Sequence, residues 1–188
     1  MIKPSPSEHY TDLVLWADFR NGDRVAFQNI YQTHLNDLFN YGCKITPSRN
    51  IVIDSIQDMF IDIWQNRSNL SDTENIKYYL FKALRRRLLR AVKKDKKYCT
   101  ETNLGTFDNT AIVLPFEYKL IKGQENKERI NHLKNAINKL TERQKEVVTL
   151  IFYEGFSYEE VSTLIGINLR STYTLAWKAL TSLRKDLV

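Results

Sequence analysis

Apolar residues recur at every third or fourth position along most of the chain, which predicts helices rather than strands. A first helix is expected over residues 12–19, and the polar stretch 21–23 ends it. A second helix begins after Asp23, whose carboxylate can cap it, and is expected to end near Gly42. The first part of the chain is therefore expected to form a helical bundle.

Two further helices follow in the first half of the chain. A third helix is expected over residues 50–64, and a polar loop follows it over residues 65–71. A fourth helix is expected to begin after Asp72 or Thr73 and to run to about Lys94. The apolar face predicted for the third helix consists of Ile53, Ile56, Phe60, Ile63 and Trp64.

The helical period disappears between about residues 95 and 124, where Gly, Pro, Asn and Thr are frequent. It resumes near residue 125, with Thr141 and Ser157 as expected N-caps and Gly166 at the end of a short helix. The pattern predicts an all-α protein of two small helical domains. The predicted boundaries are 1–97 for the first domain, 98–124 for a flexible linker and 125–188 for the second domain.

The composition narrows the class of protein. Hydrophobic residues make up 43% and charged residues 27% of the 188 positions, as in globular chains. No apolar run approaches the roughly 18 residues of a membrane helix, and the N-terminal sequence lacks the pattern of a secretory signal. A cytoplasmic location without membrane insertion is therefore expected. The two cysteines and three histidines fit no metal-binding motif, so no cofactor is expected.

The fourth helix concentrates the positive charge of a chain whose net charge is +6. Like charges at helical spacing repel each other, so an anionic partner such as phosphate would stabilise them. Tyr78, Tyr79 and Phe81 lie just upstream and could stack on unpaired bases, although a solvated basic face with core aromatics remains the alternative. Arg87 is expected near the apolar edge with its head group extended to solvent, and only Asp95 is expected to offset the charge. The basic positions are Lys82, Arg85, Arg86, Arg87, Arg90, Lys93, Lys94 and Lys97.

Residues 157–174 have the pattern of a helix-turn-helix, although helical hairpins with a glycine turn are often only structural. The second helix is expected to begin near Leu169 and to place its first residues in a major groove. Those candidate contacts are Arg170, Ser171, Tyr173 and Thr174. The side chains expected to face inward are Val161, Leu164, Ile165, Ile167, Ala176, Ala179, Leu180 and Leu183.

The polar side of the third helix carries Asp54, Gln57, Asp58 and Asp62. Paired carboxylates can bind a metal or transfer protons, but no other side chain converges on them in the sequence. A helix that displays Asp and Gln is better suited to docking on a protein surface.

Taken in order, these segments resemble the extracytoplasmic-function sigma factors, small sigma-70-type subunits that give bacterial RNA polymerase its promoter specificity. The first domain resembles sigma region two and the second resembles region four. Asp54, Gln57, Phe60 and Trp64 match the family's Asp-x-x-Gln-x-x-Phe-x-x-x-Trp pattern. The resemblance implies that Asp54 and Gln57, with Asp58 beside them, contact the clamp helices of the largest polymerase subunit.

The resemblance also implies two sets of DNA contacts. Tyr79-Leu80-Phe81 and the basic run resemble the helix that reads the minus-ten element, and residues 67–73 correspond to the loop that holds a flipped base. The segments 140–148 and 153–161 resemble region four. The implied minus-ten contacts are Asn69, Tyr78, Lys82, Arg85, Arg86, Arg90, Lys93 and Lys94. The implied minus-thirty-five contacts are Arg170, Ser171, Tyr173, Thr174 and Lys178.

The sequence departs from the family pattern at several of these positions. Arg86 stands where the family commonly has Asn. Ser171-Thr172-Tyr173 replaces Thr-Val-Lys, Leu175 replaces a frequent basic residue, and Lys178 replaces Arg. The lower charge implies weaker phosphate contacts, or recognition that relies more on Tyr173 and Thr174, or a second domain that serves mainly to dock on the polymerase flap.

The sequence therefore favours a binding protein that is not an enzyme, with core RNA polymerase, promoter DNA and an anti-sigma factor as the partners implied by the family. A helix-turn-helix regulator that binds duplex DNA alone as a dimer is the first alternative. A nucleic-acid-processing enzyme that uses Asp54, Asp58 and Asp62 with magnesium is the second.

Overall fold

The computed structural model describes residues 6–98 and 133–187, and these residues contain helices and no strands. The chain divides into two compact units, Met1–Pro115 and Phe116–Val188, so the predicted all-α, two-domain class is confirmed. The predicted linker lies outside the described residues, apart from Tyr98 at the end of a helix.

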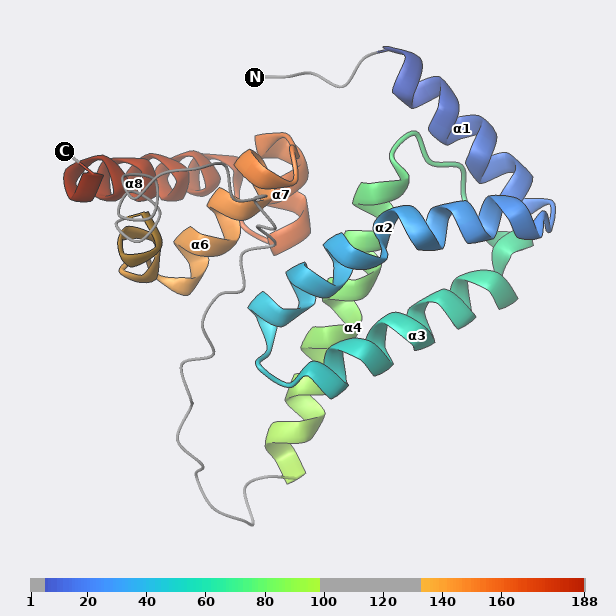
Figure 1. The fold of residues 1–188 in the computed structure, drawn as a ribbon, viewed down its shortest axis with the longest axis horizontal. Coiled ribbons are helices and arrows are strands. Elements are labelled where there is room, and N and C mark those ends of the chain that lie inside the picture. The colour runs from blue at the N-terminus through green and yellow to red at the C-terminus, as the bar shows by residue number, and fades with distance from the viewer. Residues whose placement is uncertain (1–5, 99–132, 188) are drawn as a thin grey trace, which may run out of the picture. The chain divides into compact units, whose positions relative to one another are not determined.

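The N-terminal unit contains α1 (Pro6–Arg20), α2 (Arg24–Ile45), α3 (Arg49–Gln65) and α4 (Ile76–Tyr98), with a short 3-10 turn η1 (Arg67–Asn69) after α3. Helices α2, α3 and α4 pack on one another, and α1 packs on α2 (Figure 1). The buried face of this unit consists of apolar side chains from all four helices. They include Trp16, Phe19, Ile30, Leu38, Tyr41, Val52, Ile56, Met59, Phe60, Ile76, Leu80, Phe81, Leu84 and Leu88.

Two sequence predictions for the third helix and the start of the fourth are wrong. Ile53 is 41% exposed, because the buried stripe of α3 passes through Val52, Ile56 and Met59 at helical spacing. Helix α4 is not capped by Asp72 or Thr73. The Asn75 side chain accepts a hydrogen bond from the Tyr78 N–H at 2.8 Å, and the Asp12 carboxylate of α1 accepts one from the Ile76 N–H at 2.9 Å.

Helix α2 extends beyond its predicted end. Asp23 caps its start as expected, but the helix runs through Gly42 to Ile45. A Cβ atom on Gly42 would lie 2.5 Å from Val52 Cγ1 of α3. The glycine therefore permits the close approach of α2 and α3 rather than ending the helix.

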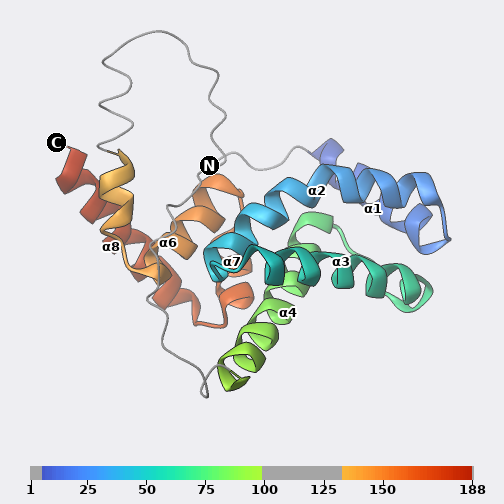
Figure 2. The ribbon, with the colours of Figure 1, turned by 60° about the horizontal axis from the view of Figure 1, so that its bottom comes forward.

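The C-terminal unit contains α6 (Glu142–Val148), a π-helical turn η3 (Thr149–Tyr153), α7 (Tyr158–Ile165) and α8 (Leu169–Leu187), after a helical stretch at residues 133–138. Figure 2 shows this unit from a second direction. Thr141 and Ser157 are N-caps with reciprocal capping boxes, and Gly166 ends α7 with φ of 72°. These three predictions are confirmed.

The core of this unit differs from the predicted one along α8. Val161, Leu164 and Ile165 of α7 are buried as predicted, as are Ala176 and Ala179. Leu180, however, is 43% exposed, while Thr172 is fully buried and its hydroxyl donates to the Asn168 carbonyl oxygen at 3.3 Å. The inward stripe of α8 therefore passes through residues 172, 176 and 179, which places Leu180 outside it.

Candidate nucleic-acid and protein-binding surfaces

The four residues of the α3 motif divide into two pairs with different environments. Phe60 is buried against Phe27 and Tyr31, and the Trp64 ring lies 4.9 Å from that of Phe27. Asp54 and Gln57 are exposed. The aromatic pair therefore fixes α3 in the bundle, and the polar pair is available to a partner.

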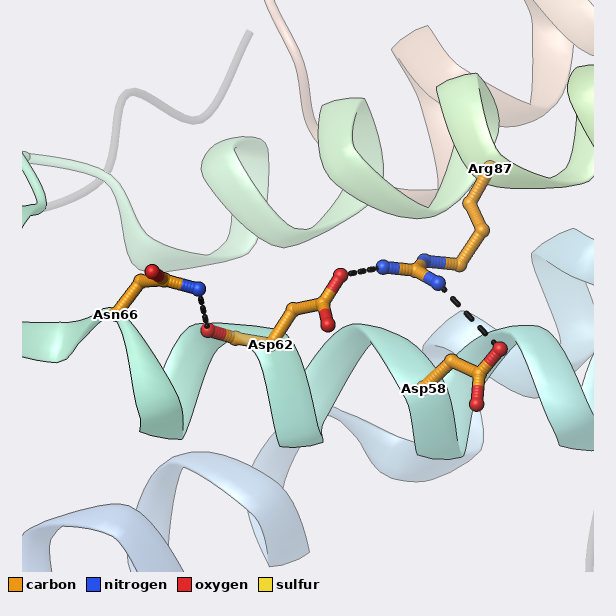
Figure 3. Close-up of polar contacts among 4 residues, drawn as sticks. All are labelled: Asp58, Asp62, Asn66 and Arg87. Atoms are coloured by element: carbon orange, nitrogen blue, oxygen red, sulfur yellow. Dashed lines mark hydrogen bonds and ion pairs between the residues drawn. The ribbon is translucent and has the colours of Figure 1, made fainter.

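The next two carboxylates on α3 contact α4 through Arg87. Its guanidinium lies between them and forms ion pairs with Asp62 and, at 3.4 Å, with Asp58 (Figure 3). The end of α3 is held further by Asn66, whose side-chain amide donates to the Asp62 carbonyl oxygen at 2.9 Å. Arg87 thus lies at the apolar edge of α4, as expected, with its side chain 30% exposed and its head group at two exposed carboxylates of α3. The expectation that only Asp95 offsets the basic helix was wrong, because sequence spacing does not show which side chains of another helix lie opposite.

This arrangement argues against a magnesium site on α3. Asp58 and Asp62 already pair with the Arg87 side chain. The described residues contain no group of three His, Cys, Asp or Glu side chains, Asp54 included, that is placed to hold a metal ion. A divalent cation needs several converging oxygen ligands.

Helix α4 has ten Lys and Arg residues against one Asp, a net charge of +9. Arg86, Arg90, Lys93 and Lys94 are exposed, whereas Lys82 and Arg85 are half-buried. With Arg87 engaged by α3, this exposed basic surface lies on the side of α4 opposite its buried residues Leu80, Leu84 and Leu88. A linear array of cations of this kind attracts a phosphate backbone.

The three aromatic residues at the start of α4 have separate roles. Phe81 is fully buried, with its ring 4.9 Å from that of Tyr41, so it cannot stack on a base. The Tyr79 ring packs 4.9 Å from Trp16, and burial raises the pKa of its hydroxyl, an effect partly offset by Arg86. Tyr78 is half-buried, with the Lys82 ammonium 5.7 Å from its ring. Of the three, Tyr78 and Tyr79 keep part of their surface exposed, whereas Phe81 does not.

The loop between α3 and α4 is anchored on both sides of Asn69. Before it, the Arg67 guanidinium lies over the Trp64 ring at 4.5 Å and donates to the Trp64 carbonyl oxygen. After it, the Ser71 carbonyl oxygen accepts a hydrogen bond from Trp16 Nε1 at 3.0 Å. Asn69 itself is exposed between these anchors.

An open pocket of about 200 Å³ lies between the end of α1 and this loop. Arg20 enters it from α1 and pairs with Asp72 at the far end of the loop. The Arg20 Nε atom is buried and has no hydrogen-bond partner within the described part of the chain. The pocket is lined by Ala17, Arg20, Asn21 and Ser68.

Helices α7 and α8 form the predicted helix-turn-helix. Asn168 begins α8, with its side-chain oxygen accepting from the Ser171 N–H at 2.7 Å. Ser171 is half-buried, and the Thr174 hydroxyl donates to the Arg170 carbonyl oxygen at 2.9 Å. The exposed candidate contacts on α8 are Arg170, Tyr173, Thr174 and Lys178.

Two aromatic residues of this unit were not found from the sequence. Tyr158 of α7 stacks on Tyr173 of α8, and Trp177 is 66% exposed one turn after Tyr173. The sequence did carry a signal for Trp177, because a residue four positions after Tyr173 lies on the same face of a helix. The stacking between α7 and α8 had no sequence signal, because it depends on the angle at Gly166.

No helix in the described ranges is both long and apolar enough to cross a membrane.

Two family descriptions match the chain. Sigma-70 region 2 matches residues 30–98 and Sigma-70 region 4 matches residues 131–183, which together span 122 of the 188 positions. Among relatives, the ECF RNA polymerase sigma factor SigM of Bacillus subtilis is 22% identical and the match covers 82% of this chain and 91% of SigM. The RNA polymerase sigma factor SigV of the same organism is 23% identical, and the match covers 82% of this chain and 86% of SigV.

Solved structures show the same fold. The sigma factor RpoE of Bartonella quintana, solved in complex with the anti-sigma factor NepR, has a TM-score of 0.64 at 22% identity and covers 86% of this chain and 96% of its own. CnrH, solved in complex with the cytosolic domain of CnrY, has a TM-score of 0.57 at 16% identity. The match covers 93% of this chain and 95% of CnrH.

Proposed function

The chain belongs to the sigma-70 family, as an RNA polymerase sigma factor of the extracytoplasmic-function type, and we propose that it binds core polymerase and directs promoter recognition and strand opening. Residues 1–97 act as the region-two domain and residues 125–188 as the region-four domain. Residues 98–124 are the linker between them.

The observation that carries this proposal is that two helices of the N-terminal unit expose chemically different side chains. Asp54 and Gln57 are exposed on α3, whereas the exposed cations of α4 belong to the next helix. A protein that must contact a polymerase and a nucleic acid at once needs two such faces on one rigid body.

The α3 face docks on the polymerase. Asp54 and Gln57 form hydrogen bonds to the clamp helices of the largest subunit, and the buried Phe60 and the packed Trp64 hold α3 at a fixed orientation. Asp58 lies on the same face, but its ion pair with Arg87 leaves it a smaller share of the binding energy.

The α4 surface and the loop before it bind the minus-ten element. Arg86, Arg90, Lys93 and Lys94, with Lys82 and Arg85, contact phosphates, and Tyr78 stacks on an unpaired base. Asn69, with the open pocket lined by the preceding residue Ser68 and by Ala17, Arg20 and Asn21, takes a base removed from the stack. The stacking on Tyr78 and the capture of the flipped base occur only with separated strands. Together with the phosphate contacts, they offset the few kcal/mol that base flipping costs.

Helix α8 reads the minus-thirty-five element as duplex DNA. Arg170 and Lys178 contact phosphates, and Ser171, Tyr173 and Thr174 approach base edges in the major groove. Because α8 has a net charge of only +3, compared with +9 on α4, this contact depends less on phosphates.

Binding, with no catalytic step and no cofactor, accounts for this function, and the proposed location is the cytoplasm, where polymerase and DNA are. The anti-sigma complexes of RpoE and CnrH support an anti-sigma partner for this chain as well. Such a partner would compete with core polymerase for the exposed α3 face.

The decisive experiment is transcription in vitro with core polymerase on a library of promoter fragments. We expect transcripts only when the chain is added, from fragments that share two elements at fixed spacing. Binding of isolated duplex is measured in parallel. Tight duplex binding without any polymerase-dependent transcription would instead support a helix-turn-helix regulator and would overturn the proposal.

A further inference from the structure

The first turn of α7 contacts the recognition helix through two stacked tyrosines. The rings of Tyr158 and Tyr173 lie 4.2 Å apart between centroids, with an interplanar angle of 18°. Tyr158 is half-buried and Tyr173 is 48% exposed. One face of the Tyr173 ring is therefore covered, and the rest of the side chain remains accessible.

The backbone on both sides of this stack is fixed by local hydrogen bonds. Ser157 and Glu160 form the capping box that sets the start of α7, and Asn168 caps α8. Gly166 connects them in the left-handed conformation that sets the angle between the two helices. With both helix starts fixed, the Tyr158 ring restricts the rotamers that Tyr173 can adopt.

The charges of this motif explain why such restriction matters. Helices α7 and α8 together have four basic and three acidic residues, a net charge of +1. Phosphate contacts alone therefore hold this motif weakly on DNA. The Thr174 hydroxyl is already engaged with the Arg170 carbonyl oxygen, and Tyr173 is the exposed aromatic side chain on the early part of α8.

We propose that Tyr158 is a positioning residue that fixes the Tyr173 ring for base-edge contact, so that the stacked pair sets the base preference at one position of the minus-thirty-five element. This inference rests on the proposed function of α8 as the reader of that element. A phenol offers a hydroxyl to base-edge donors and acceptors and a ring edge to a thymine methyl group. Pre-orienting it reduces the side-chain entropy lost on binding.

The test uses the full chain with core polymerase and a promoter library randomised across the minus-thirty-five element, with a constant minus-ten element. Tyr173→Ala identifies the base pair that Tyr173 reads. We expect Tyr158→Ala to weaken the preference at that same base pair by about 2- to 10-fold, the range of an aromatic stacking contact. Tyr158→Phe, which keeps the stack, should retain the wild-type preference.

Tyr158→Leu separates stacking from packing. It keeps a bulky apolar side chain at this position without an aromatic face, so we expect it to lose the preference as Tyr158→Ala does, even if the alanine variant folds poorly. The double variant Tyr158→Ala with Tyr173→Ala should lose no more preference than Tyr173→Ala alone. Preference for the minus-ten element, measured on a second library, should stay unchanged in every Tyr158 variant.

The outcomes distinguish this inference from the function on which it rests. If wild-type protein yields no promoter-dependent transcript, the proposed function fails. If wild-type protein is active but Tyr158→Leu keeps the full preference, or lowers all promoters equally, then Tyr158 only packs the two helices together and the inference is overturned.

Discussion

At the scale of single residues, Gly42 shows how packing can override a local signal. A glycine in a helix interior ordinarily weakens the helix by about 1 kcal/mol relative to alanine, and it often marks a helix end. Here the helix continues to Ile45, and the glycine serves packing instead, because Val52 Cγ1 and Leu88 Cδ1 would lie 2.5 and 3.4 Å from a Cβ atom at this position. The sequence could not show this, since the contact joins three different helices.

Gly42→Ala is therefore expected to destabilise the N-terminal unit by about 1–3 kcal/mol, the usual range for overpacking, despite the higher helix propensity of alanine. Urea unfolding monitored by circular dichroism measures the change. Adding Val52→Ala removes the closest atom, so the double variant should lose less stability than the two single variants do together. If the double variant loses as much stability as the two single variants do together, the close approach of Gly42 to Val52 is not the cause of the destabilisation.

His34 is a second residue whose environment matters more than its type. Burial lowers the pKa of its imidazole, and Lys77 adds to this, while Asp12 and Asp37 oppose it. The unfolded chain has the ordinary histidine pKa of about 6.5. Because the folded pKa lies lower, the unfolded state binds more protons as the pH falls, so this contribution to stability is present above about pH 6.5 and is lost below it.

We expect the N-terminal unit to lose stability between pH 7.5 and 5.5, and His34→Gln to reduce that loss. Trp177→Phe provides a suitable background, since the remaining tryptophans, Trp16 and Trp64, both report on this unit. The measurement is the urea midpoint by fluorescence at both pH values. An unchanged pH dependence in His34→Gln would show that other groups cause it.

At the scale of elements, adjacent residues of α4 have different tasks. Arg87 bridges to Asp58 and Asp62 of α3, whereas Arg86 is exposed. Both belong to one run of three arginines, and from the sequence alone both are expected to lie on the same basic face of the helix. The difference arises because α3 lies beside one edge of that face, which no property of α4 alone can indicate.

The two arginines make a matched pair of variants. Arg87→Gln is expected to lower the stability of the N-terminal unit by about 0.5–1 kcal/mol, the range of a partly exposed ion-pair network, and to leave the salt dependence of promoter opening unchanged. Arg86→Gln should leave the stability unchanged and reduce the salt slope by about 0.7–0.9 for the lost phosphate contact. Urea unfolding and open-complex formation across a salt series measure these effects, and identical behaviour of the two variants would contradict the assignment.

Helix boundaries set by local chemistry were the most predictable elements. Asp23, Thr141 and Ser157 cap helices through their own side chains, and Gly166 ends α7 by its own conformation. The start of α4 was not predictable in the same way. Asp72 and Thr73 are equally good caps by type, but Arg20 pairs with Asp72, and the helix begins where Asn75 and the distant Asp12 can satisfy its N–H groups.

At the scale of the whole molecule, the order of the motifs is what made the function predictable. A basic helix and a helical hairpin have many uses, but in this order, after the α3 motif, they specify the family. The sequence did not separate the motif residues by task, because only the packing of α3 shows that Phe60 is buried while Asp54 and Gln57 are exposed.

Replacing both Asp54 and Gln57 by alanine is expected to weaken core polymerase binding by at least about 10-fold, as for loss of charge-assisted hydrogen bonds in an interface. Thermal unfolding should be unchanged, since both side chains are exposed. Affinity is measured with fluorescently labelled protein and purified core enzyme. A matched control is Gln65→Ala, which replaces another exposed residue at the end of the same helix, and a loss of the same size there would argue against a specific docking role.

Helix α1 lies outside the segment that matches region 2, yet it completes the N-terminal bundle. The match begins at residue 30, whereas Trp16 and Phe19 are buried, and Asp12 holds the first turn of α4. An expression fragment cut to residues 30–98 would expose the apolar surface that these rings cover and would aggregate. A fragment intended for crystallisation or for screening inhibitors should therefore begin upstream of Asp12.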